Sequence, residues 1–532
     1  MSKNTRSTLR RTWDRIRYFF PHCRYIILST SLGFFASLFS LAGPYLSRFY
    51  IDTSFLNRDL TAFIRLSLVG IVIFLFSTLA NFIADVIRNK TLLSIKLSLA
   101  NAFIRRLYTL DLAFFHEKSV GENIYRISNI ESIAHFISEE VPRLLVDSLR
   151  LVIVVVVALF INARLTVLLF ILSPFLLLHS FYLRSKIKPI FLEIWRSNAR
   201  LSKMLQESLS KMQIIKALNL ETFERRFYIR LLIENIRLSV KGFRWFAANS
   251  LSSTFLSKAV YGILSLYGGW LIIRGELSLG SYTAVMLYIS QAGGVLNLLS
   301  YRMEYFVQQG VSMEKFFEVI DSQPMIKDAA KSVRIESIKK EIFFQAVRFG
   351  YTTDKPVFNR LDLAIPAGKW LGIVGYSGCG KTTLVKLMLR LYEPQEGVIL
   401  LDGIDLRTIK IESLRKKISV ATQEPFLFDL SVKENICLGL PYVSEREFNE
   451  TVAFVRLEEL LRHLPQGADS SLGENAVFLS QGYKQRIALA RAVIRKPDVL
   501  ILDEATSSID SAAETDILKA LKAARNGFTT IV

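Results

Sequence analysis

Apolar residues gather in six long runs within the first 310 positions of the chain. Each run is about 20 residues long, which is the length of α-helix that crosses the hydrocarbon core of a bilayer. A single run of this length also fits a buried helix of a soluble protein, but six in series would form a core larger than globular domains build. We therefore predict six membrane-spanning helices, at roughly residues 26–51, 66–87, 144–161, 165–183, 251–273 and 278–299.

The hydrophobic pattern changes beyond the sixth run. Helical periodicity continues as far as Pro324, and residues 329–340 are charged and show no core pattern. The chain then alternates short apolar strands with helices, as in EIFFQAVRFGY, WLGIVG and VLILDE. We expect four regions: a cytoplasmic N-terminus with an interfacial helix at 1–24, a transmembrane domain at 25–320, a linker at 321–340 and a soluble α/β domain at 341–532.

Basic residues lie mainly beside the apolar runs. The net charge is +20, and residues 88–143 and 184–244 hold 8 and 14 Lys and Arg, respectively, whereas the connections near Asn162 and Gly275 hold few. By the positive-inside rule, both basic segments and the N-terminus face the cytoplasm, which requires an even number of spans. This distribution favours a lipid bilayer as the partner and argues against nucleic acid, which binds clustered charge on a soluble domain.

The N-terminal segment carries no signal peptide, because charge continues to Arg24 and no small-residue cleavage site follows. Residues 9–20 mix arginines with apolar residues near helical spacing. This pattern predicts a helix that lies on anionic lipid, and a solvated basic tail is the alternative.

Two connections between the apolar runs, from the second to the third and from the fourth to the fifth, are each about 55 to 65 residues long, a length that is rare for a loop without structure. Neither has an interior rich in Gly and Pro, so we predict helices that project into the cytoplasm. Their tips, FHEKSVGENIYRISNIES and ALNLETFERRFY, are polar and charged. Solvated surface and a docking role both remain open for these tips.

A phosphate-binding motif follows the second apolar strand of the soluble part. The strand WLGIVG runs into GYSGCGKT at residues 375–382 and then into TLVKLMLRLY, which matches G-x-x-x-x-G-K-[ST] in its strand, loop and helix context. Glycines let backbone N–H groups close around phosphate oxygens. We predict that Lys381 contacts the β- and γ-phosphates of ATP and that Thr382 binds Mg²⁺. The predicted ATP-binding residues are Tyr351, Gly375, Tyr376, Ser377, Gly378, Cys379, Gly380, Lys381, Thr382 and Thr383.

Two acids end the wholly apolar strand VLILDE, which is typical of a central parallel strand. We predict that Asp503 holds Mg²⁺ and that Glu504 is the catalytic residue that polarises the attacking water. A helix N-cap is the alternative for such a pair. Gln423 falls between the two motifs, where its amide reaches Mg²⁺ or the water. Tyr351 precedes the phosphate loop and can stack on adenine, although a lone aromatic there also fits a strand.

This ordered set of motifs resembles the ATP-binding cassette (ABC) exporters, and the resemblance covers nearly the whole chain. Tyr351 corresponds to the A-loop, Gln423 to the Q-loop, residues 479–483 to the signature, residues 499–503 to Walker B and Asp510 to the end of the D-loop. The resemblance implies an α-helical transmembrane domain of six spans followed by an α/β P-loop ATPase domain. It also implies dimerisation with a second half-transporter, and a coupling role for both loop tips.

The signature departs from the family pattern. It begins LSQGY at residue 479, where the family has LSGGQ at a helix N-terminus that faces the γ-phosphate held by the other subunit. Ser480 supplies the hydroxyl and Gly482 the close backbone approach, whereas Gln481 replaces a glycine and Tyr483 a glutamine. We predict an altered but working clamp. A weakened site, as in heterodimeric exporters, is the alternative.

The chain stops at GFTTIV, just before the position of the family's switch histidine, and none of the five histidines fits that role. We expect a truncated sequence, and an enzyme that evolved without this residue is the alternative.

We predict ATP-driven export by a dimer in the cell membrane, with ATP and Mg²⁺ as cofactors and with a cytoplasmic N-terminus and ATPase domain. An ATP-binding regulatory or structural membrane subunit, or a degenerate partner of a heterodimer with little turnover, is the alternative. The transported substrate stays open. Asp147 and Arg150 in the third run and SYTAVMLYISQ in the sixth fit polar groups that face a cavity, or ones that pair helices.

Overall fold

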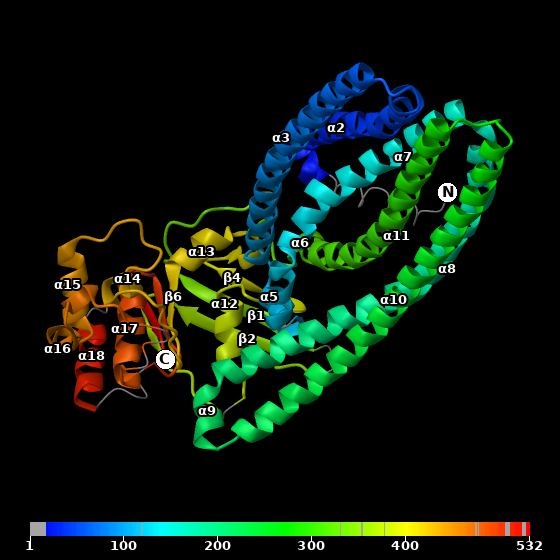
Figure 1. The fold of residues 1–532 in the computed structure, drawn as a ribbon. Coiled ribbons are helices and arrows are strands. Elements are labelled where there is room, and N and C mark those ends of the chain that lie inside the picture. The colour runs from blue at the N-terminus through cyan, green and yellow to red at the C-terminus, as the bar shows by residue number, and fades with distance from the viewer. Residues whose placement is uncertain are drawn as a thin grey trace. The chain divides into compact units, whose positions relative to one another are not determined.

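The chain folds into two compact units, Met1–Gln323 and Pro324–Val532, each of which is described by itself (Figure 1). This computed structural model describes residues 17–118, 120–329, 331–352, 355–376, 378–473, 476, 478–505, 511–523 and 528–532. The expected interfacial helix lies largely outside these residues, and its end falls in η1 (Arg17–His22).

The described part of the first unit is helical. Six long helices follow the six predicted spans, and short helical pieces occupy the tips of the two long connections. The long helices are α2 (Cys23–Phe49), α3 (Leu60–Leu107), α7 (Val141–Ile161), α8 (Ala163–Ser210), α10 (Glu221–Ile273) and α11 (Leu279–Asp321). The short pieces of the long connections are α4 (Leu112–Glu117), α5 (Val120–Ser128), α6 (Ile130–His135), η3 (Phe136–Glu140) and α9 (Met212–Ala217), and a further piece, η2 (Tyr50–Phe55), joins α2 to α3.

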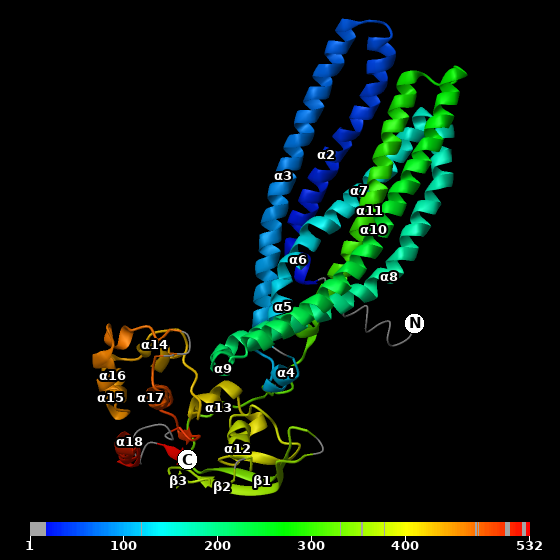
Figure 2. The same ribbon diagram turned by 60° about the horizontal axis from the view of Figure 1, so that its bottom comes forward.

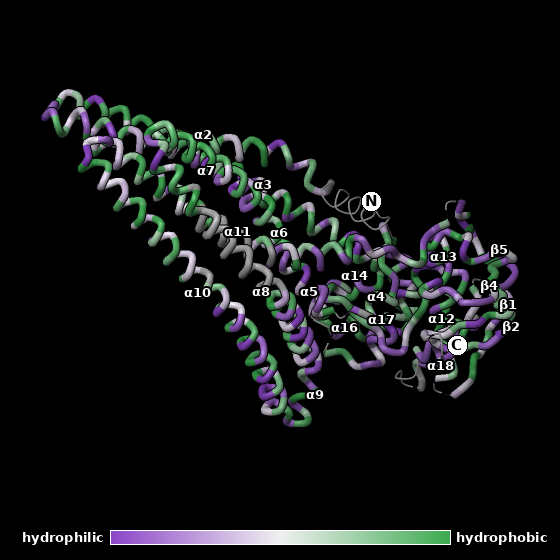
Figure 3. Tube along the Cα trace, turned by 90° about the vertical axis from the view of Figure 1, so that its right-hand side faces the viewer, coloured by the Kyte–Doolittle hydropathy of each residue, from purple (hydrophilic) through white to green (hydrophobic). Residues whose placement is uncertain are grey.

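Four helical stretches within the described residues are long and apolar enough to cross a membrane: Tyr18–Phe55, Leu60–Leu107, Val120–Ile161 and Glu221–Ile273. The other two predicted spans lie in α8 and α11. The long helices are not apolar over their whole length. Figure 3 shows that α8 and α10 become hydrophilic as they approach α9. The long connections are therefore helical extensions of the spans.

Polar caps set the starts of three long helices. The carboxylate of Asp59 accepts hydrogen bonds from the N–H groups of Thr61 and Ala62 at 2.9 and 3.0 Å before α3. Asn162 and Ser278 accept from the third residue after them, at 3.0 and 3.1 Å, before α8 and α11. These side chains satisfy backbone donors that the first turn of a helix leaves free.

Close contacts hold α11 against α2 and η2. Asp52 accepts hydrogen bonds from the N–H of Gly280 at 2.9 Å and from the hydroxyl of Ser278 at 2.7 Å. A Cβ on Gly280 would lie 2.5 Å from the carbonyl oxygen of Arg48, so a glycine is needed there. The hydroxyl of Tyr288, which is 1% exposed, donates to the carbonyl oxygen of Leu41 at 2.6 Å.

The second unit contains an antiparallel and a parallel sheet, each of four strands. The antiparallel sheet has the order β2 (Phe358–Pro366), β1 (Glu341–Phe349), β4 (Glu396–Leu401), β5 (Ile404–Asp405). The parallel sheet has the order β3 (Trp370–Leu371), β8 (Thr529–Ile531), β7 (Val499–Leu502), β6 (Ile418–Ala421). All four residues of β7 are buried, as its apolar sequence predicts.

Some helices of the second unit pack on these sheets, and others enclose an apolar cluster of their own. The helical elements are α12 (Lys381–Met388), η4 (Leu406–Thr408), α13 (Ile411–Lys417), α14 (Val432–Ile436), α15 (Glu445–Phe454), α16 (Glu458–His463), η5 (Gly467–Asp469), α17 (Gln481–Val493) and α18 (Ser511–Ala523). Buried side chains of α12 and α13 share one apolar cluster with β1. Figure 2 shows α12 beside β1 and β2. Helices α14 to α17 enclose a second cluster that includes Ile436, Ile487 and Leu502.

The expected strand and helix around the phosphate loop are both shorter in the structure. β3 ends at Leu371, and the N–H of Ile373 makes one more bond, to the carbonyl oxygen of Val532 at 2.8 Å, before the chain leaves the sheet. α12 ends at Met388 because Arg390 adopts φ of 49°. The buried guanidinium of Arg390 donates hydrogen bonds to the carbonyl oxygens of Ile409 and Lys327 at 3.2 and 2.9 Å, and these bonds hold the turn in place.

Part of the segment that we expected to be a linker packs on the second unit. Ile338 is buried, and its N–H donates to the carboxylate of Asp498 at 2.7 Å. The N–H groups of Lys339 and Lys340 donate to the carboxylate of Asp402 at 2.8 and 2.7 Å. The segment before β1 is therefore held in place by hydrogen bonds from its backbone N–H groups to carboxylates. Apolar periodicity in the sequence does not reveal such bonds.

Candidate functional site

The phosphate loop connects β3 to α12 and depends on its glycines. Gly378 and Gly380 have φ of 83° and 106°, in the left-handed region that favours glycine. A Cβ on Gly380 would lie 2.8 Å from side-chain atoms of both Val357 and Phe358. The loop therefore needs glycine at this position for two reasons. Another residue would be strained at this φ, and its Cβ would collide with neighbouring side chains. Ser377 lies outside the described residues.

Lys381 is the first residue of α12. Its ammonium group donates hydrogen bonds to the carbonyl oxygens of Gly375 and Tyr376 at 2.7 and 3.2 Å. The positive charge is thus held over the loop, at the N-terminus of a helix whose dipole also favours an anion. This arrangement suits a phosphate group.

Two parallel strands bring the remaining polar residues together. Ala421 of β6 pairs with Leu502 of β7, and the N–H of Asp503 donates to the carbonyl oxygen of Ala421 at 2.9 Å. Just beyond these ends, the amide nitrogen of Gln423 donates to the carboxylate of Glu504 at 2.5 Å. Both side chains are exposed. The structure therefore places the predicted catalytic pair in direct contact.

Oxygen atoms suited to a divalent cation lie beside this pair. The hydroxyl of Thr382 and a carboxylate oxygen of Asp503 are 3.2 Å apart. Among the described residues, no group of three or more His, Cys, Asp or Glu could hold a metal ion. Hydroxyl and carboxylate oxygens nevertheless fit Mg²⁺, which protein sites usually bind through one or two side chains together with water and substrate phosphates.

Tyr351 lies in an aromatic group beside the phosphate loop. Its ring centroid is 5.3 Å from those of both Phe349 and Tyr392. Its hydroxyl is 3.1 Å from the hydroxyl of Thr383, and the ammonium of Lys386 lies 5.3 Å from its ring centroid. Burial raises the pKa of the Tyr392 hydroxyl. Tyr351 itself is 48% exposed, so part of its surface stays open to a nucleotide base.

The signature begins α17. The hydroxyl of Ser480 accepts a hydrogen bond from the N–H of Tyr483 at 3.4 Å and so acts as the N-cap. Gln481 is exposed, whereas Tyr483 is half-buried against the apolar cluster of α14 to α17, with the guanidinium of Arg486 5.1 Å from its ring centroid. The two departures from the family pattern therefore differ: one side chain faces solvent and the other packs inside.

Gln485 is a residue that sequence reasoning missed. It is 1% exposed, and its amide nitrogen donates to the carbonyl oxygen of Gln423 at 3.3 Å. This bond connects α17 to the segment that carries the predicted Q-loop side chain. A glutamine two residues after the signature gives no signal in one sequence, because its partner is 62 positions away. Asp510, the predicted end of the D-loop, lies outside the described residues.

The comparisons with known families cover both units. Residues 26–296 match the ABC transporter transmembrane region, and residues 358–507 match the ABC transporter family. The chain belongs to the ABC transporter family. The predicted family and fold class are therefore confirmed.

Relatives of this ABC transporter match along most of its length. The chain is 30% identical to the uncharacterized ABC transporter ATP-binding protein YwjA of Bacillus subtilis, over 97% of this chain and 91% of that protein. It is 31% identical to an ATP-dependent lipid A-core flippase of Syntrophus aciditrophicus, over 91% and 80% of the two chains. It is 28% identical to the alpha-hemolysin translocation ATP-binding protein HlyB of Escherichia coli O157:H7, over 96% and 72%.

A solved structure of a bacterial Atm1-family ABC exporter with ATP bound has the same fold as this transporter. The TM-score is 0.85 and the identity 23%, with 96% of this chain and 90% of that chain covered. The transporter is thus a multi-pass membrane protein with an ATP-binding domain, and an ATPase coupled to transport. The enzyme class predicted from the motifs is confirmed.

Proposed function

We propose that this ABC transporter is half of a dimeric exporter of the cell membrane, with its N-terminus and ATPase domain on the cytoplasmic side. The observation that carries the proposal is the contact of Gln423 with Glu504 at 2.5 Å, beside a phosphate loop and a hydroxyl–carboxylate pair. An exporter of this type hydrolyses ATP to change the side to which its cavity opens. The similarity to relatives named for lipid A-core and alpha-hemolysin supports export as the direction.

Each group at the nucleotide site has a distinct proposed role. Lys381 neutralises the β- and γ-phosphates, backbone N–H groups of residues 375–383 bind their oxygens, and Tyr351 stacks on adenine. Thr382, Asp503 and Gln423 would hold Mg²⁺, which would neutralise phosphate charge. Glu504 accepts a hydrogen bond from the attacking water and orients it.

The second half of each ATP site comes from the partner subunit in this proposal. Ser480 and Gly482 would face the γ-phosphate bound by the partner, with Gln481 and Tyr483 beside them and Asp510 at the D-loop. Because Tyr483 is already packed against its own unit and Gln481 is exposed, the helix start keeps its cap despite both replacements. This supports a working clamp. The two polar tips, residues 115–132 and 217–228, would serve as coupling elements.

Replacing the glutamate tests the proposal. Purified Glu504→Gln protein should lose most of its ATP hydrolysis, about 10²- to 10⁴-fold, while it still binds ATP. Glu424→Gln is the matched control, because Glu424 is exposed and lies on the same segment as Gln423. Equal hydrolysis by the Glu504→Gln and wild-type proteins would contradict the proposal.

A degenerate subunit of a heterodimer is the second candidate, and the replaced signature residues Gln481 and Tyr483 favour it. Native mass spectrometry of the complex extracted from its own membrane separates the two candidates. Two equal chains would support the homodimer, in which the altered signature serves both ATP sites. Two unequal chains would show that this subunit supplies its signature to a different partner.

A further inference from the structure

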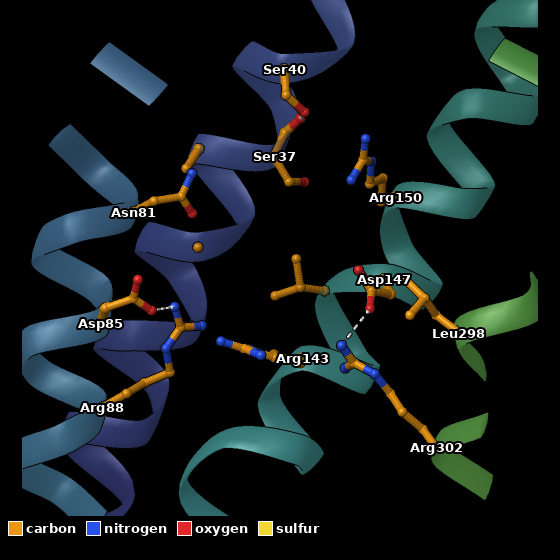
Figure 4. A pocket seen from close by; sticks show the side chains of 13 residues that line it. Ser37, Ser40, Asn81, Asp85, Arg88, Arg143, Asp147, Arg150, Leu298 and Arg302 are labelled. Carbon is orange, nitrogen blue, oxygen red and sulfur yellow. Dashed lines mark hydrogen bonds and ion pairs between the residues drawn. The ribbon is translucent and has the colours of Figure 1, made fainter. Parts of the chain in front are cut away.

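The first unit contains a polar cavity of about 440 Å³ between α2, α3, α7 and α11 (Figure 4). Arginines from three helices line it: Arg88 of α3, Arg143 and Arg150 of α7, and Arg302 of α11. Asp85 and Asp147 are the acids among the described lining residues. Arg150 lies inside the predicted span at residues 144–161, where a charge is costly unless it serves a function, whereas the other three arginines lie just beyond the ends of their spans.

Acids pair with three of these arginines. Arg88 forms an ion pair with Asp85, and Arg143 forms one with Glu139 at 2.6 Å. Arg302 lies 3.2 Å from a carboxylate oxygen of Asp147 and 3.7 Å from one of Glu140. These pairs account for part of the guanidinium charge and explain how the helices tolerate it.

Arg150 is different, because its hydrogen-bond partner is neutral. Its guanidinium donates to the amide oxygen of Gln291 at 3.4 Å, a long and weak bond. Among the described residues, no carboxylate lies within ion-pair distance of it. Figure 4 shows its side chain on the far side of the cavity from Asp85 and Arg88. The cavity thus contains one positive charge without an acidic partner in the described structure.

Hydrogen-bond donors also exceed acceptors in this cavity. The Nε atoms of Arg88 and Arg150, one terminal nitrogen of Arg302 and the hydroxyl of Ser37 are buried without a hydrogen-bond partner in the described part of the chain. One acceptor is in the same position, a carboxylate oxygen of Asp147, but it forms an ion pair with Arg302. Buried polar groups in folded proteins are nearly always satisfied, and unsatisfied ones point to a missing partner. Most of these groups are guanidinium donors of residues that line the cavity, which favours a ligand rich in acceptor oxygens.

We propose that this cavity binds an anionic oxyacid group, of the phosphate class, on the molecule that the transporter moves. The proposal rests on the proposed export function and names its substrate class. Arginine suits this task, because its planar fork stays charged and matches phosphate oxygens with two parallel N–H donors. A phosphate binds here either as the head group of a lipid or as a free ion.

Lipid binding to the full-length protein tests the proposal. Dioleoylphosphatidic acid is titrated into the protein in mild detergent, with dioleoylphosphatidylcholine as the zwitterionic comparison, and bound lipid is counted by native mass spectrometry. Wild-type protein should prefer phosphatidic acid. Arg150→Gln should weaken its binding about tenfold or more, the usual loss for a hydrogen bond to a charged group.

Two further variants separate the site from general charge. Arg150→Lys keeps the charge but loses the planar fork, so it should recover part of the affinity, which a purely packing role would not predict. Arg164→Gln removes the same charge from an exposed ion pair with Glu276 and should bind like wild type. Unchanged binding by Arg150→Gln, or equal binding of both lipids by wild type, would overturn the proposal.

A competition experiment shows whether the bound phosphate group must belong to a lipid. If millimolar inorganic phosphate displaces phosphatidic acid, the oxyanion alone is sufficient; if it does not, the binding requires the lipid, and either result supports an anionic subsite. Basal ATP hydrolysis is measured on the same samples. Lost hydrolysis with intact lipid preference would refute the export function, whereas intact hydrolysis without lipid preference would refute the anionic subsite.

Discussion

The amide of Gln423 donates a hydrogen bond to Glu504 at 2.5 Å across 81 positions of sequence. The contact exists because β6 and β7 are parallel neighbours in register, so that their carboxyl ends open at the same edge of the sheet. Ligands of parallel α/β sheets bind at this edge. The pair therefore links the two strands at the point where the γ-phosphate of ATP is expected.

Removing the amide should slow hydrolysis. Gln423→Ala deletes the group that holds the Glu504 carboxylate, and we expect a fall in the turnover number of about tenfold or more, since misplacing a catalytic group is costly. ATP affinity should fall less than the turnover number, because Lys381 and the phosphate loop stay in place and Gln423 is only one of the three proposed Mg²⁺ ligands. Steady-state hydrolysis against ATP concentration gives both values. Glu424→Ala, at an exposed neighbouring position, is the control, and a change in affinity alone would contradict this role.

Gln485 should act through Gln423. Gln485→Leu leaves the carbonyl oxygen of Gln423 without this buried donor, which costs about 1–3 kcal/mol. We expect a lower turnover number with an unchanged Michaelis constant for ATP. Combining Gln485→Leu with Gln423→Ala should give less than the product of the two separate effects. Full multiplication of the two effects would show that the residues act independently.

Gly380→Ala should damage the phosphate loop. The added Cβ would meet Val357 and Phe358 at 2.8 Å, and φ of 106° disfavours any residue with a Cβ. We expect the free energy of unfolding to fall by about 1–3 kcal/mol and ATP binding to be lost. Gly372→Ala is the matched control, because a Cβ there would have open space. Thermal unfolding and ATP binding are measured for both variants. Equal losses in the two variants would disprove the steric argument.

Lys381→Ala should weaken ATP binding. The variant removes the ammonium that the loop carbonyls hold at 2.7 and 3.2 Å, so the phosphates lose a charge-assisted partner. We expect a loss of affinity of about tenfold or more. Equilibrium binding of ATP measures the loss. Lys416→Ala removes an exposed lysine that pairs with Glu412 and should leave affinity unchanged.

Much of the second unit could be predicted from short local stretches of sequence. The phosphate loop could be predicted because its glycines, Lys381 and Thr382 are contiguous, so a short stretch fixes backbone and chemistry together. Asp503 and Glu504 could be predicted because a wholly apolar strand ends beside them. Gln485 and the true ends of β3 and α12 could not. They depend on the bond to Gln423, on the partner Val532 and on the buried turn at Arg390, which no local pattern records.

The sequence by itself determined which segments are apolar enough to span a bilayer, that a short connection near Asn162 separates two of them, and which loop has the pattern of a phosphate-binding site. Hydrophobic length and local hydrogen bonding suffice for these features. Only the tertiary structure decided that Gln423 meets Glu504, and that Arg88, Arg150 and Arg302 surround one cavity. Such pairs depend on strand register and helix packing, which join residues that the chain itself holds far apart.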